Sequence, residues 1–359
     1  MIAARPKPLH RLCGRAMLLH ILDGLAELAP SQVVVVVGHG SERVTKKLVD
    51  DGPAGLAIDF VDQVVQRGTG HALMVALTAF SDDELDDWTT DGEDVLVVPG
   101  DAPLLRSSTL AQLVETHHRT GAAATLLSAR VPDPRGYGRV VRGRDDRVVG
   151  IVEDVEARPD EAAIGEVATS VYCFRRSVLA PALRRLSPEN RKGEYYLTDI
   201  IAVLAGAGYG VTSLVIDDPL EAVGVNDRVQ LAVAEAELRR RNNQRWMELG
   251  VTMVDPERTY VDTTVRLASD VTLFPGTLLQ GMTVVGEGAE VGPDSHLVDC
   301  AVGARARVAH SVATEAEIGE GAQVGPFTHL PPGTTVAPGE VTGAFYTPHT
   351  STPTLRAGG

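Results

Sequence analysis

The chain has 359 residues and a mass of 38.0 kDa, which suits two or three domains, and 44% of its residues are hydrophobic, enough for sizeable cores. Thirty-three Lys and Arg face 48 Asp and Glu, a net charge of −15 that repels nucleic acid and anionic lipid. No apolar run approaches the roughly 20 residues of a membrane span. The three scattered cysteines match neither a disulfide framework nor a zinc site, and we expect them to pack in cores. These features predict a globular, cytoplasmic protein that binds neither nucleic acid nor membranes.

From Lys7 to about Leu220, short β-branched runs alternate with longer amphipathic ones. The expected strands are Val33–Val37, Val95–Val98, Ala124–Ser128, Val171–Phe174 and Val211–Val215. The expected helices are Met17–Leu28, Gly70–Phe80, Ser108–Thr120 and Asp199–Gly206. This alternation predicts an α/β domain over residues 1–225, with a mostly parallel sheet covered by helices.

A connecting helix is predicted next, over residues 226–249. Val229, Ala232, Val233 and Ala236 recur at helical spacing, and the basic run Arg239–Arg245 follows them. We interpret this run as the solvated face of a helix end rather than as a ligand site.

The last part of the chain has a six-residue period, and glycine follows several of its aliphatic residues directly. The aliphatic groups are Val265 and Val271; Val285, Val291 and Leu297; Val302 and Val308; and Ile318, Val324, Leu330 and Val336. One inward aliphatic side chain per six residues predicts a parallel β-helix over residues 250–341. The Thr-, Pro- and Gly-rich residues 342–359 are expected to form a disordered tail.

Asp101 comes directly after the predicted strand Val95–Val98. Ligands of open α/β sheets bind beyond the carboxyl ends of the strands, where this carboxylate is placed to hold a hard cation. A cap for the helix that begins near Ser107 explains the residue equally well at this point.

A second candidate is the stretch from Gln63 to Ala72, in which two glycines bracket Thr69 just before a helix. Free backbone N–H groups and the positive end of the helix dipole favour an anion or a nucleobase edge there. Packing in the first helical turn explains His71 better than acid–base chemistry does.

Three further polar segments interrupt apolar surroundings: the loop Asp133–Arg139, Glu153 after the strand-like run Val148–Val152, and the segment Gly193–Asp199. Each also has an ordinary interpretation as a turn or a cap. Asn226 is either a helix N-cap or an oxygen ligand. The sequence contains no Ser-His-Asp grouping and no P-loop, so covalent and Walker-type chemistries are not indicated.

Taken in order, seven motifs resemble the uridylyltransferase half of the bacterial bifunctional N-acetylglucosamine-1-phosphate uridylyltransferase/glucosamine-1-phosphate acetyltransferase family. They are Pro6–His10, Gln63–Ala72, Gly100–Leu104, Asp133–Arg139, Ile151–Glu153, Gly193–Asp199 and Gly224–Arg228. The repeats resemble the start of that family's left-handed β-helix. The resemblance extends to about residue 336. It implies a Rossmann-like nucleotidyltransferase domain followed by the connecting helix and a short left-handed parallel β-helix of hexapeptide repeats.

By this resemblance, a sugar 1-phosphate attacks the α-phosphate of UTP in line, giving pyrophosphate and UDP-N-acetylglucosamine, a peptidoglycan precursor. Mg²⁺ would be held by Asp101 and Asn226, and Lys7 would lie on the phosphates. The implied nucleotide-binding residues are Gln63, Gln66, Gly68 and Thr69, and the implied sugar-binding positions are Gly138, Glu153, Ala168 and Thr198. The resemblance also implies a homo-oligomer, a trimer built on the β-helix.

Three departures from the family pattern lead to expectations of their own. The family's first strand and Gly-rich nucleotide loop have no counterpart before Pro6, so we expect Met1 to be an internal methionine of a longer reading frame. Ala168 stands where the family has a sugar-binding asparagine, a loss that typically weakens discrimination by about 1–3 kcal/mol. Pro331 replaces an arginine of the amino-sugar site, and the family's acetyl-transfer residues lie further on, so we expect no acetyltransferase activity.

The sequence thus predicts a Mg²⁺-dependent sugar-nucleotide pyrophosphorylase. One alternative is a non-catalytic scaffold or regulatory subunit, which the missing loop and Ala168 favour. The joint presence of Lys7, Asp101 and Asn226 opposes that alternative, because a scaffold needs no ligands for a divalent cation. The other alternative is the same chemistry with another nucleotide or sugar 1-phosphate.

Overall fold

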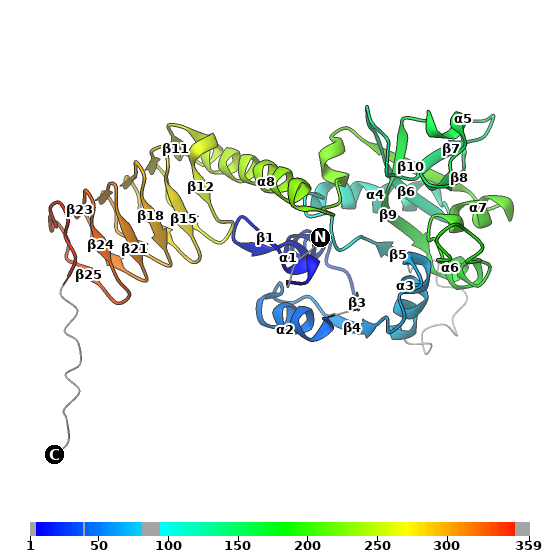
Figure 1. Ribbon diagram of the computed structural model, residues 1–359, viewed down its shortest axis with the longest axis horizontal. Coiled ribbons are helices and arrows are strands. Elements are labelled where there is room, and N and C mark those ends of the chain that lie inside the picture. The colour runs from blue at the N-terminus through cyan, green and yellow to red at the C-terminus, as the bar shows by residue number, and fades with distance from the viewer. Residues whose placement is uncertain (1–4, 39, 81–93, 349–359) are drawn as a thin grey trace, which may run out of the picture. The chain divides into compact units, whose positions relative to one another are not determined.

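The computed structural model describes residues 5–38, 40–80 and 94–348, and the chain divides into two compact units. Unit 1 comprises Met1–His10 and Ala16–Leu231, and unit 2 comprises Arg11–Arg15 and Ala232–Gly359. Unit 1 holds the α/β elements and unit 2 the β-helix (Figure 1). Among the described helices, none combines the length and the apolar character that crossing a membrane requires.

Unit 1 contains every strand and helix predicted for it. Its helices are α1 (Met17–Ala26), α2 (Ser41–Asp51), α3 (Thr69–Ala76), α4 (Ser107–Thr120), α5 (Pro159–Ala162), α6 (Arg176–Leu183) and α7 (Asp199–Gly206), with 3-10 turns η1 (Lys7–Leu9), η2 (Leu77–Ala79) and η4 (Pro219–Ala222). Its strands are β3 (Val33–Val37), β4 (Ile58–Asp62), β5 (Asp94–Val97), β6 (Ala124–Arg130), β7 (Arg139–Arg142), β8 (Val148–Val152), β9 (Glu166–Arg175) and β10 (Val211–Ile216). The sequence did not predict β4, β7, α2, α5 or α6.

The main sheet has the order β10-β6-β9-β7-β8, and β5 also pairs with β9. β10 and β6 are parallel, but β9 runs antiparallel to β6, β5 and β7. The expectation of a mostly parallel sheet is therefore wrong around β9. Parallel neighbours need a crossover of about a dozen residues or more, and the connections from β6 to β7 and from β7 to β8 are shorter than that.

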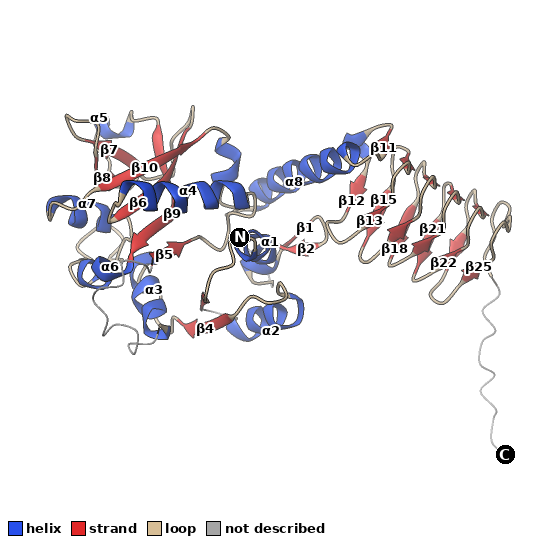
Figure 2. Ribbon diagram, turned by 180° about the vertical axis from the view of Figure 1, so that it is seen from behind, coloured by secondary structure: helices blue, strands red, loops and turns tan. Residues whose placement is uncertain are grey.

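Both faces of this sheet are buried. Along β6, Leu126 packs into the core with α6 and α7, while Leu127 packs into the core with α4. Figure 2 shows α4 lying across the sheet on one side. Burial on both faces explains why β6 is a near-continuous apolar run without polar alternation.

β3 and β4 form a separate parallel pair. In the parts of the chain that the structure describes, β3 pairs with β4 alone and β5 pairs with β9 alone. Val34 and Val36 of β3 nevertheless pack against the same core as Val95 and Val97 of β5. Each of these two strands thus keeps one edge without a strand partner.

The predicted connecting helix is α8 (Arg228–Glu248). Its basic run is only partly a solvated face. Arg240 and Arg241 donate hydrogen bonds to the Glu237 carboxylate at 2.8 and 2.6 Å, and the Arg239 guanidinium lies 4.6 Å from the centre of the Tyr260 ring. The run therefore stabilises the helix and its contact with the first coil of the β-helix.

Replacing Glu237 with glutamine should lower the free energy of unfolding by about 1–3 kcal/mol at pH 7, the range for hydrogen bonds to charged groups. Hydrogen bonds from Arg240, opposed by burial and reinforced by Arg241, lower the pKa of Glu237 to about 2. Because the folded pKa lies below the unfolded value of about 4.3, this stabilisation is present above that pH and is lost as the pH falls toward 2.

Urea unfolding of the wild-type protein and of Glu237→Gln at pH 7 and pH 3 measures this loss of stability. An equal loss at both pH values would contradict the assignment, and Glu248→Gln near the exposed helix end serves as the control.

Unit 2 is a left-handed parallel β-helix built from three five-stranded sheets. The first sheet contains β11 (Thr252–Met253), β14 (Thr272–Leu273), β17 (Glu290–Val291), β20 (Arg307–Val308) and β23 (Gln323–Val324). The second contains β12 (Tyr260–Val261), β15 (Leu278–Gln280), β18 (His296–Val298), β21 (Val312–Thr314) and β24 (His329–Leu330). The third contains β13 (Arg266–Leu267), β16 (Val284–Val285), β19 (Ala301–Val302), β22 (Glu317–Ile318) and β25 (Thr335–Val336). The 3-10 turn η5 (Pro256–Arg258) lies in the first coil, and a short pair, β1 (Arg11–Leu12) and β2 (Arg15–Ala16), precedes α1.

The six-residue period reflects two buried positions per repeat, two residues apart. In the strands, Leu273, Val291, Val308 and Val324 stack in register from coil to coil. Two residues before each stands a second buried side chain, Val271, Ala289, Ala306 or Ala322. The prediction therefore had the right period, but its first group, Val265 and Val271, belongs to the turn position rather than the strand position, which Leu267 and Leu273 occupy.

Ordered contacts continue past residue 341, where the sequence placed the start of the tail. The Phe345 N–H donates to the Pro326 carbonyl at 3.0 Å, and the Phe345 ring stacks on Phe327 with centroids 5.2 Å apart. The His329 N–H donates to the Tyr346 carbonyl at 2.9 Å. These residues extend the last coil, and residues 349–359 of the predicted tail lie outside the described part of the chain.

Candidate active site

Three side chains predicted to act on phosphate meet in unit 1, and we name them the Lys7 cluster: Lys7, Asp101 and Asn226. The Lys7 ammonium donates to Asp101 Oδ2 in a short contact and to Asn226 Oδ1 at 2.7 Å. Lys7 lies in η1, Asp101 follows β5, and Asn226 precedes α8. Asp101 and Asn226 lie 94 and 219 positions away from Lys7 in the sequence. They nevertheless converge on its ammonium group.

Backbone contacts join the loops that carry Asp101 and Asn226. The Val225 N–H donates to the Asp101 carbonyl at 2.8 Å. A Cβ at Gly224 would lie 3.5 Å from Asp101 Oδ1 and 3.8 Å from Asn226 Nδ2. The backbone of Gly224 therefore lies beside both side chains. The loops are therefore held together independently of Lys7.

Neither residue serves the helix cap that the sequence left open as an alternative. At the start of α8, the carboxylate that accepts a backbone hydrogen bond is Asp227, from the Gln230 N–H at 2.7 Å. At the start of α4, Glu221 accepts from the Arg106 N–H at 3.3 Å. The Asp101 and Asn226 side chains are thus directed to the cluster.

The donor set of this cluster fits a divalent cation. A carboxylate oxygen and an amide oxygen already point at one positive group, and Mg²⁺ takes hard oxygen ligands of these types. The side chains of Lys7 and Asp101 are about one-third exposed, which leaves room for phosphate oxygens and water.

The loop that begins α3 docks on the segment before α7. Thr69 Oγ1 accepts from the Leu197 N–H at 3.1 Å, and the Gly70 N–H donates to the Tyr195 carbonyl at 2.8 Å. Gly68 has a φ of 98° and comes so near this segment that a Cβ would lie 2.7 Å from the Tyr195 carbonyl oxygen. The motif therefore needs glycine at this position for both its backbone conformation and its close approach.

The two glutamines of the same loop take different positions. Gln63 Nε2 donates to the Gly68 carbonyl at 3.2 Å and lies 3.0 Å from His71 Nδ1, so His71 supports the loop. The Gln66 amide lies against Gly38, where a Cβ would be 2.8 Å from Gln66 Nε2. The sequence-based prediction missed Gly38, although two glycines directly after a strand at this sheet edge were a usable signal.

The four predicted sugar-binding positions form a second group, the Glu153 cluster: Gly138, Glu153, Ala168 and Thr198. The Thr198 hydroxyl donates to Glu153 Oε1 at 2.8 Å, and the Ala168 N–H donates to the Gly138 carbonyl at 2.8 Å. A Cβ at Gly138 would lie 3.8 Å from Glu153 Oε1 and 3.9 Å from Thr198 Cγ2. All four positions are therefore neighbours, joined to the Gly68 loop by the segment that carries Thr198.

Two tyrosine hydroxyls near this cluster were not singled out from the sequence. Tyr172 follows Ala168 on β9, and Tyr196 precedes Thr198. Both side chains are buried, and their hydroxyls find no hydrogen-bond partner among the described residues. Burial, and after it the charge of Glu153, raises the pKa of Tyr172, which remains a neutral donor.

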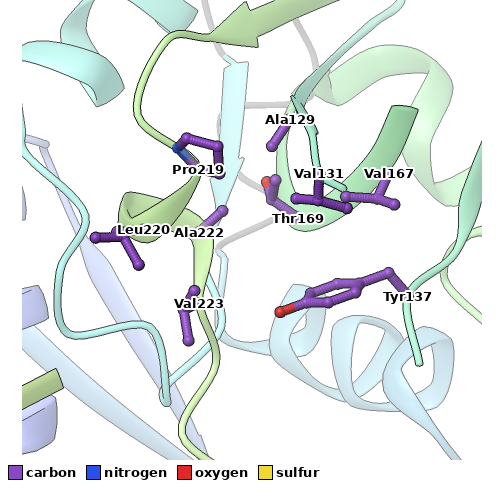
Figure 3. A pocket seen from close by; sticks show the side chains of 9 residues that line it. All are labelled: Ala129, Val131, Tyr137, Val167, Thr169, Pro219, Leu220, Ala222 and Val223. Carbon is purple, nitrogen blue, oxygen red and sulfur yellow. The ribbon is translucent and has the colours of Figure 1, made fainter. Parts of the chain in front are cut away.

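A separate apolar hollow of about 180 Å³ lies on the other face of β9 (Figure 3). Val167 and Thr169 line it, and Ala168 between them points to the opposite face because side chains alternate along a strand. Tyr137 extends along one side, facing the segment Pro219–Val223. The hollow thus flanks the Glu153 cluster without receiving its polar groups.

Comparison with known proteins places this arrangement in a family. The model of the nucleotidyl transferase family matches residues 3–252, a range that includes the Lys7 cluster, the Gly68 loop and the Glu153 cluster. This chain belongs to the nucleotidyl transferase family. Enzymes of the family generally use a divalent metal ion, in agreement with the oxygen ligands of the Lys7 cluster.

Within this family, the chain is similar to bifunctional GlmU proteins. The GlmU of Thermobifida fusca is 46% identical over 318 residues, covering 89% of this chain and 64% of that protein. That of Streptomyces avermitilis is 44% identical over 335 residues, covering 93% and 67%. That of Heliobacterium modesticaldum is 38% identical over 345 residues, covering 96% and 72%. This chain thus spans about two thirds of the length of these relatives.

Solved structures also align with this nucleotidyl transferase. HddC from Yersinia pseudotuberculosis, complexed with GMP-PN, matches 66% of this chain and 91% of its own at 14% identity and a TM-score of 0.46. This similarity is too distant to support a statement about function.

Proposed function

We propose that this nucleotidyl transferase is a sugar-nucleotide pyrophosphorylase that converts UTP and N-acetylglucosamine 1-phosphate to UDP-N-acetylglucosamine and pyrophosphate. The observation that carries the proposal is the convergence of Asp101 and Asn226 on the Lys7 ammonium. Nucleotidyl transfer needs positioning and charge neutralisation rather than a covalent group, and this cluster offers both. The similarity to GlmU proteins supports the choice of substrates.

Each group has a role in this proposal. Lys7 neutralises phosphate oxygens, and Asp101 and Asn226 hold Mg²⁺, which when bound supplies further charge neutralisation for the phosphates. Gln63, Gln66 and the backbone of Gly68 and Thr69 bind the nucleotide. Glu153 and Thr198 bind sugar hydroxyls at the Glu153 cluster, whose backbone groups come from Gly138.

A second candidate is the same reaction with another sugar 1-phosphate. The observation that favours it is Ala168, whose methyl group gives the Glu153 cluster no polar side chain at that position. The acyl-amino group of N-acetylglucosamine would then lack one polar partner at this cluster. Discrimination between sugars should be weaker as a result.

Pyrophosphate release by the full-length gene product tests the proposal. The assay combines UTP and other nucleoside triphosphates with a panel of sugar 1-phosphates, with Mg²⁺ and with EDTA. We expect the fastest turnover with UTP and N-acetylglucosamine 1-phosphate, and none in EDTA. Faster turnover of another sugar would select the second candidate, and no turnover of any pair would leave the scaffold interpretation.

Replacing Thr198 with valine should raise the KM for the sugar 1-phosphate by about fivefold, because the substitution removes one hydrogen bond worth about 1 kcal/mol. The lost bond is that from the Thr198 hydroxyl to Glu153 Oε1. Initial rates at varied sugar phosphate and at varied UTP measure the effect, and the KM for UTP is the internal control. A change confined to UTP would contradict the assignment of this cluster to the sugar.

We propose further that these 359 residues carry no acetyltransferase activity, since Pro331 occupies the position of an arginine expected from the family resemblance. Incubation with acetyl-CoA and glucosamine 1-phosphate should release no free CoA above a blank without protein. Release that depends on the sugar would contradict this expectation.

The proposal includes a cytoplasmic trimer assembled through the β-helix. Large apolar side chains on the outside of unit 2 support association, among them Val284, Val312 and Phe327, which are 48%, 46% and 57% exposed. Light scattering coupled to size-exclusion chromatography gives the mass of the particle. A monomer at micromolar concentration would argue against this part of the proposal.

A further inference from the structure

A second group of potential ligands lies at the start of β5, and we name it the Asp94 cluster: Asp94, His117, His118 and Cys173. Asp94 is the first residue of β5, the two histidines lie in the last turn of α4, and Cys173 lies on β9, where it pairs with Leu96 of β5. Figure 1 shows β5 beside β9. The three elements that contribute these side chains are thus packed together in unit 1.

The distances within the cluster suit metal coordination. His117 Nε2 lies 3.3 Å from Asp94 Oδ1. A ligand atom from each of Asp94, His117 and Cys173 lies within 4.8 Å of the other two. In a tetrahedral zinc site with bonds of about 2.0–2.1 Å to nitrogen and oxygen, those two atoms are about 3.3 Å apart, and sulfur lies about 3.6 Å from each. The upper limit of 4.8 Å exceeds the sulfur distance of such a site by about 1 Å, so small movements of the side chains bring the three atoms to one ion.

The surroundings orient these ligands. His117 Nδ1 lies 2.8 Å from the Thr125 hydroxyl, which holds the ring with Nε2 toward Asp94. His118 Nε2 lies 2.8 Å from Asp94 Oδ2, the carboxylate oxygen that His117 does not contact. Metal-bound histidines and carboxylates characteristically have such outer partners. The His117 ring and the Cys173 thiol are also buried, since these residues are 2% and 1% exposed, whereas His118 lies at the surface.

We propose that Asp94, His117 and Cys173 bind a transition-metal ion of the zinc class, with water as the fourth ligand and His118 as the outer partner of the carboxylate. Nitrogen, oxygen and sulfur ligands together favour Zn²⁺ over Mg²⁺, which takes oxygen ligands. This site is distinct from the Lys7 cluster, which contains no thiol. The sequence alone discouraged the idea, because residues 94, 117 and 173 have no metal-binding spacing.

Zinc binding replaces the S–H bond of Cys173 with a Zn–S bond, and the proton leaves to solvent. Burial, and after it the charge of Asp94, raises the pKa of the Cys173 thiol to about 12, so the metal-free thiol is neutral. Burial opposes ionisation of Asp94, but hydrogen bonds from His117 and His118 lower the pKa of its carboxyl on balance. The thiol therefore has to give up its proton when the ion binds.

A purely structural role makes a different prediction. Ion pairs between Asp94 and the two histidines would hold the end of α4 to β5 without any part played by the thiol. Sulfur ligation is the property that separates the two interpretations, so the experiment has to detect it directly.

Titration of the full-length protein with Co²⁺, in excess Mg²⁺ to occupy oxygen-ligand sites, tests the proposal. We expect one ion per chain, an intense thiolate-to-cobalt absorption band, and displacement by Zn²⁺. Cys173→Ala should abolish the band, and Cys300→Ala, which removes another buried cysteine, should leave it unchanged. His118→Ala should weaken binding by about 10- to 100-fold, the usual effect of losing an outer partner.

X-ray absorption of the zinc-loaded wild-type protein makes the test independent of how the variants fold. One sulfur at about 2.3 Å together with nitrogen and oxygen ligands would support the site. A shell of oxygen and nitrogen alone, no thiolate band, or a band that persists in Cys173→Ala would overturn it. None of these measurements depends on nucleotidyl transfer. Their outcome therefore tests the metal site separately from the proposed function.

Discussion

Replacing Asp101 with asparagine should lower the kcat for pyrophosphate release by about 10²- to 10³-fold, the loss typical of removing one group that stabilises charge in a transition state. Asparagine keeps the shape of the side chain and still reaches Lys7, but it removes the negative charge that attracts a divalent cation. The concentration of Mg²⁺ needed for half-maximal rate should therefore rise as well. Initial rates over a Mg²⁺ series at saturating UTP and sugar phosphate measure both effects.

The matched control for Asp101 is Asp145→Asn. Asp145 lies in the turn between β7 and β8, is well exposed, and pairs with Arg147 at 2.8 Å. Its replacement should leave kcat and the Mg²⁺ requirement within about twofold of the wild-type values. Surface ion pairs contribute only about 0–1 kcal/mol to stability, so the fold should also be unaffected. If Asp101→Asn behaved like this control, the assignment of Asp101 as a metal ligand would be lost.

Replacing Gly303 with alanine should lower the free energy of unfolding of unit 2 by about 1–3 kcal/mol, and by more if the coils cannot separate. A Cβ at Gly303 would lie 2.6 Å from the Glu320 nitrogen and 2.8 Å from the Gly319 carbonyl carbon, both backbone atoms of the next coil. That backbone is held by the hydrogen bond from the Gly303 N–H to the Ile318 carbonyl at 2.7 Å. The added methyl group therefore has to push apart two coils that the sheet holds together.

The control for Gly303 is Gly206→Ala at the end of α7 in unit 1. A Cβ there would meet no atom within 4 Å, so alanine should leave the unfolding of unit 2 unchanged. Urea unfolding followed by the fluorescence of Trp246, which is buried in the β-helix core, reports on unit 2 when Trp88 is replaced by phenylalanine. Equal stability of Gly303→Ala and the parent would show that the coils are less tightly stacked than described.

Local pattern was enough to predict most elements of the fold. Val33–Val37 is a run of five β-branched residues and forms a strand with those bounds, and the helix Asp199–Gly206 was predicted to the residue. β7, with the sequence Arg-Val-Val-Arg, was missed because four residues with charged ends carry no periodic signal. The direction of β9 was also missed, because the direction of a strand depends on its connections and not on its own composition.

For the candidate site too, some residues were predicted from the sequence and others were found only in the structure. The strand-end rule pointed to Asp101 and the glycine pattern to Gly68, but neither residue could be separated from an ordinary cap or turn without the family resemblance. The structure removes the cap alternative for Asn226, because Asp227 has that role. Gly38 had a sequence signal that the prediction did not use, whereas the buried hydroxyls of Tyr172 and Tyr196 became visible only in the folded structure.

The sequence by itself determined most strands and helices and the six-residue repeat of this nucleotidyl transferase, because these depend on the spacing of apolar side chains along a few neighbouring residues. Tertiary structure alone decided which loops meet: the contact of Lys7 with Asp101 and Asn226, and the approach of Asp94, His117 and Cys173. Such contacts depend on how strands pair and helices pack between segments that can lie a hundred residues or more apart in the sequence. No local period encodes them, so they become visible only when the chain is folded.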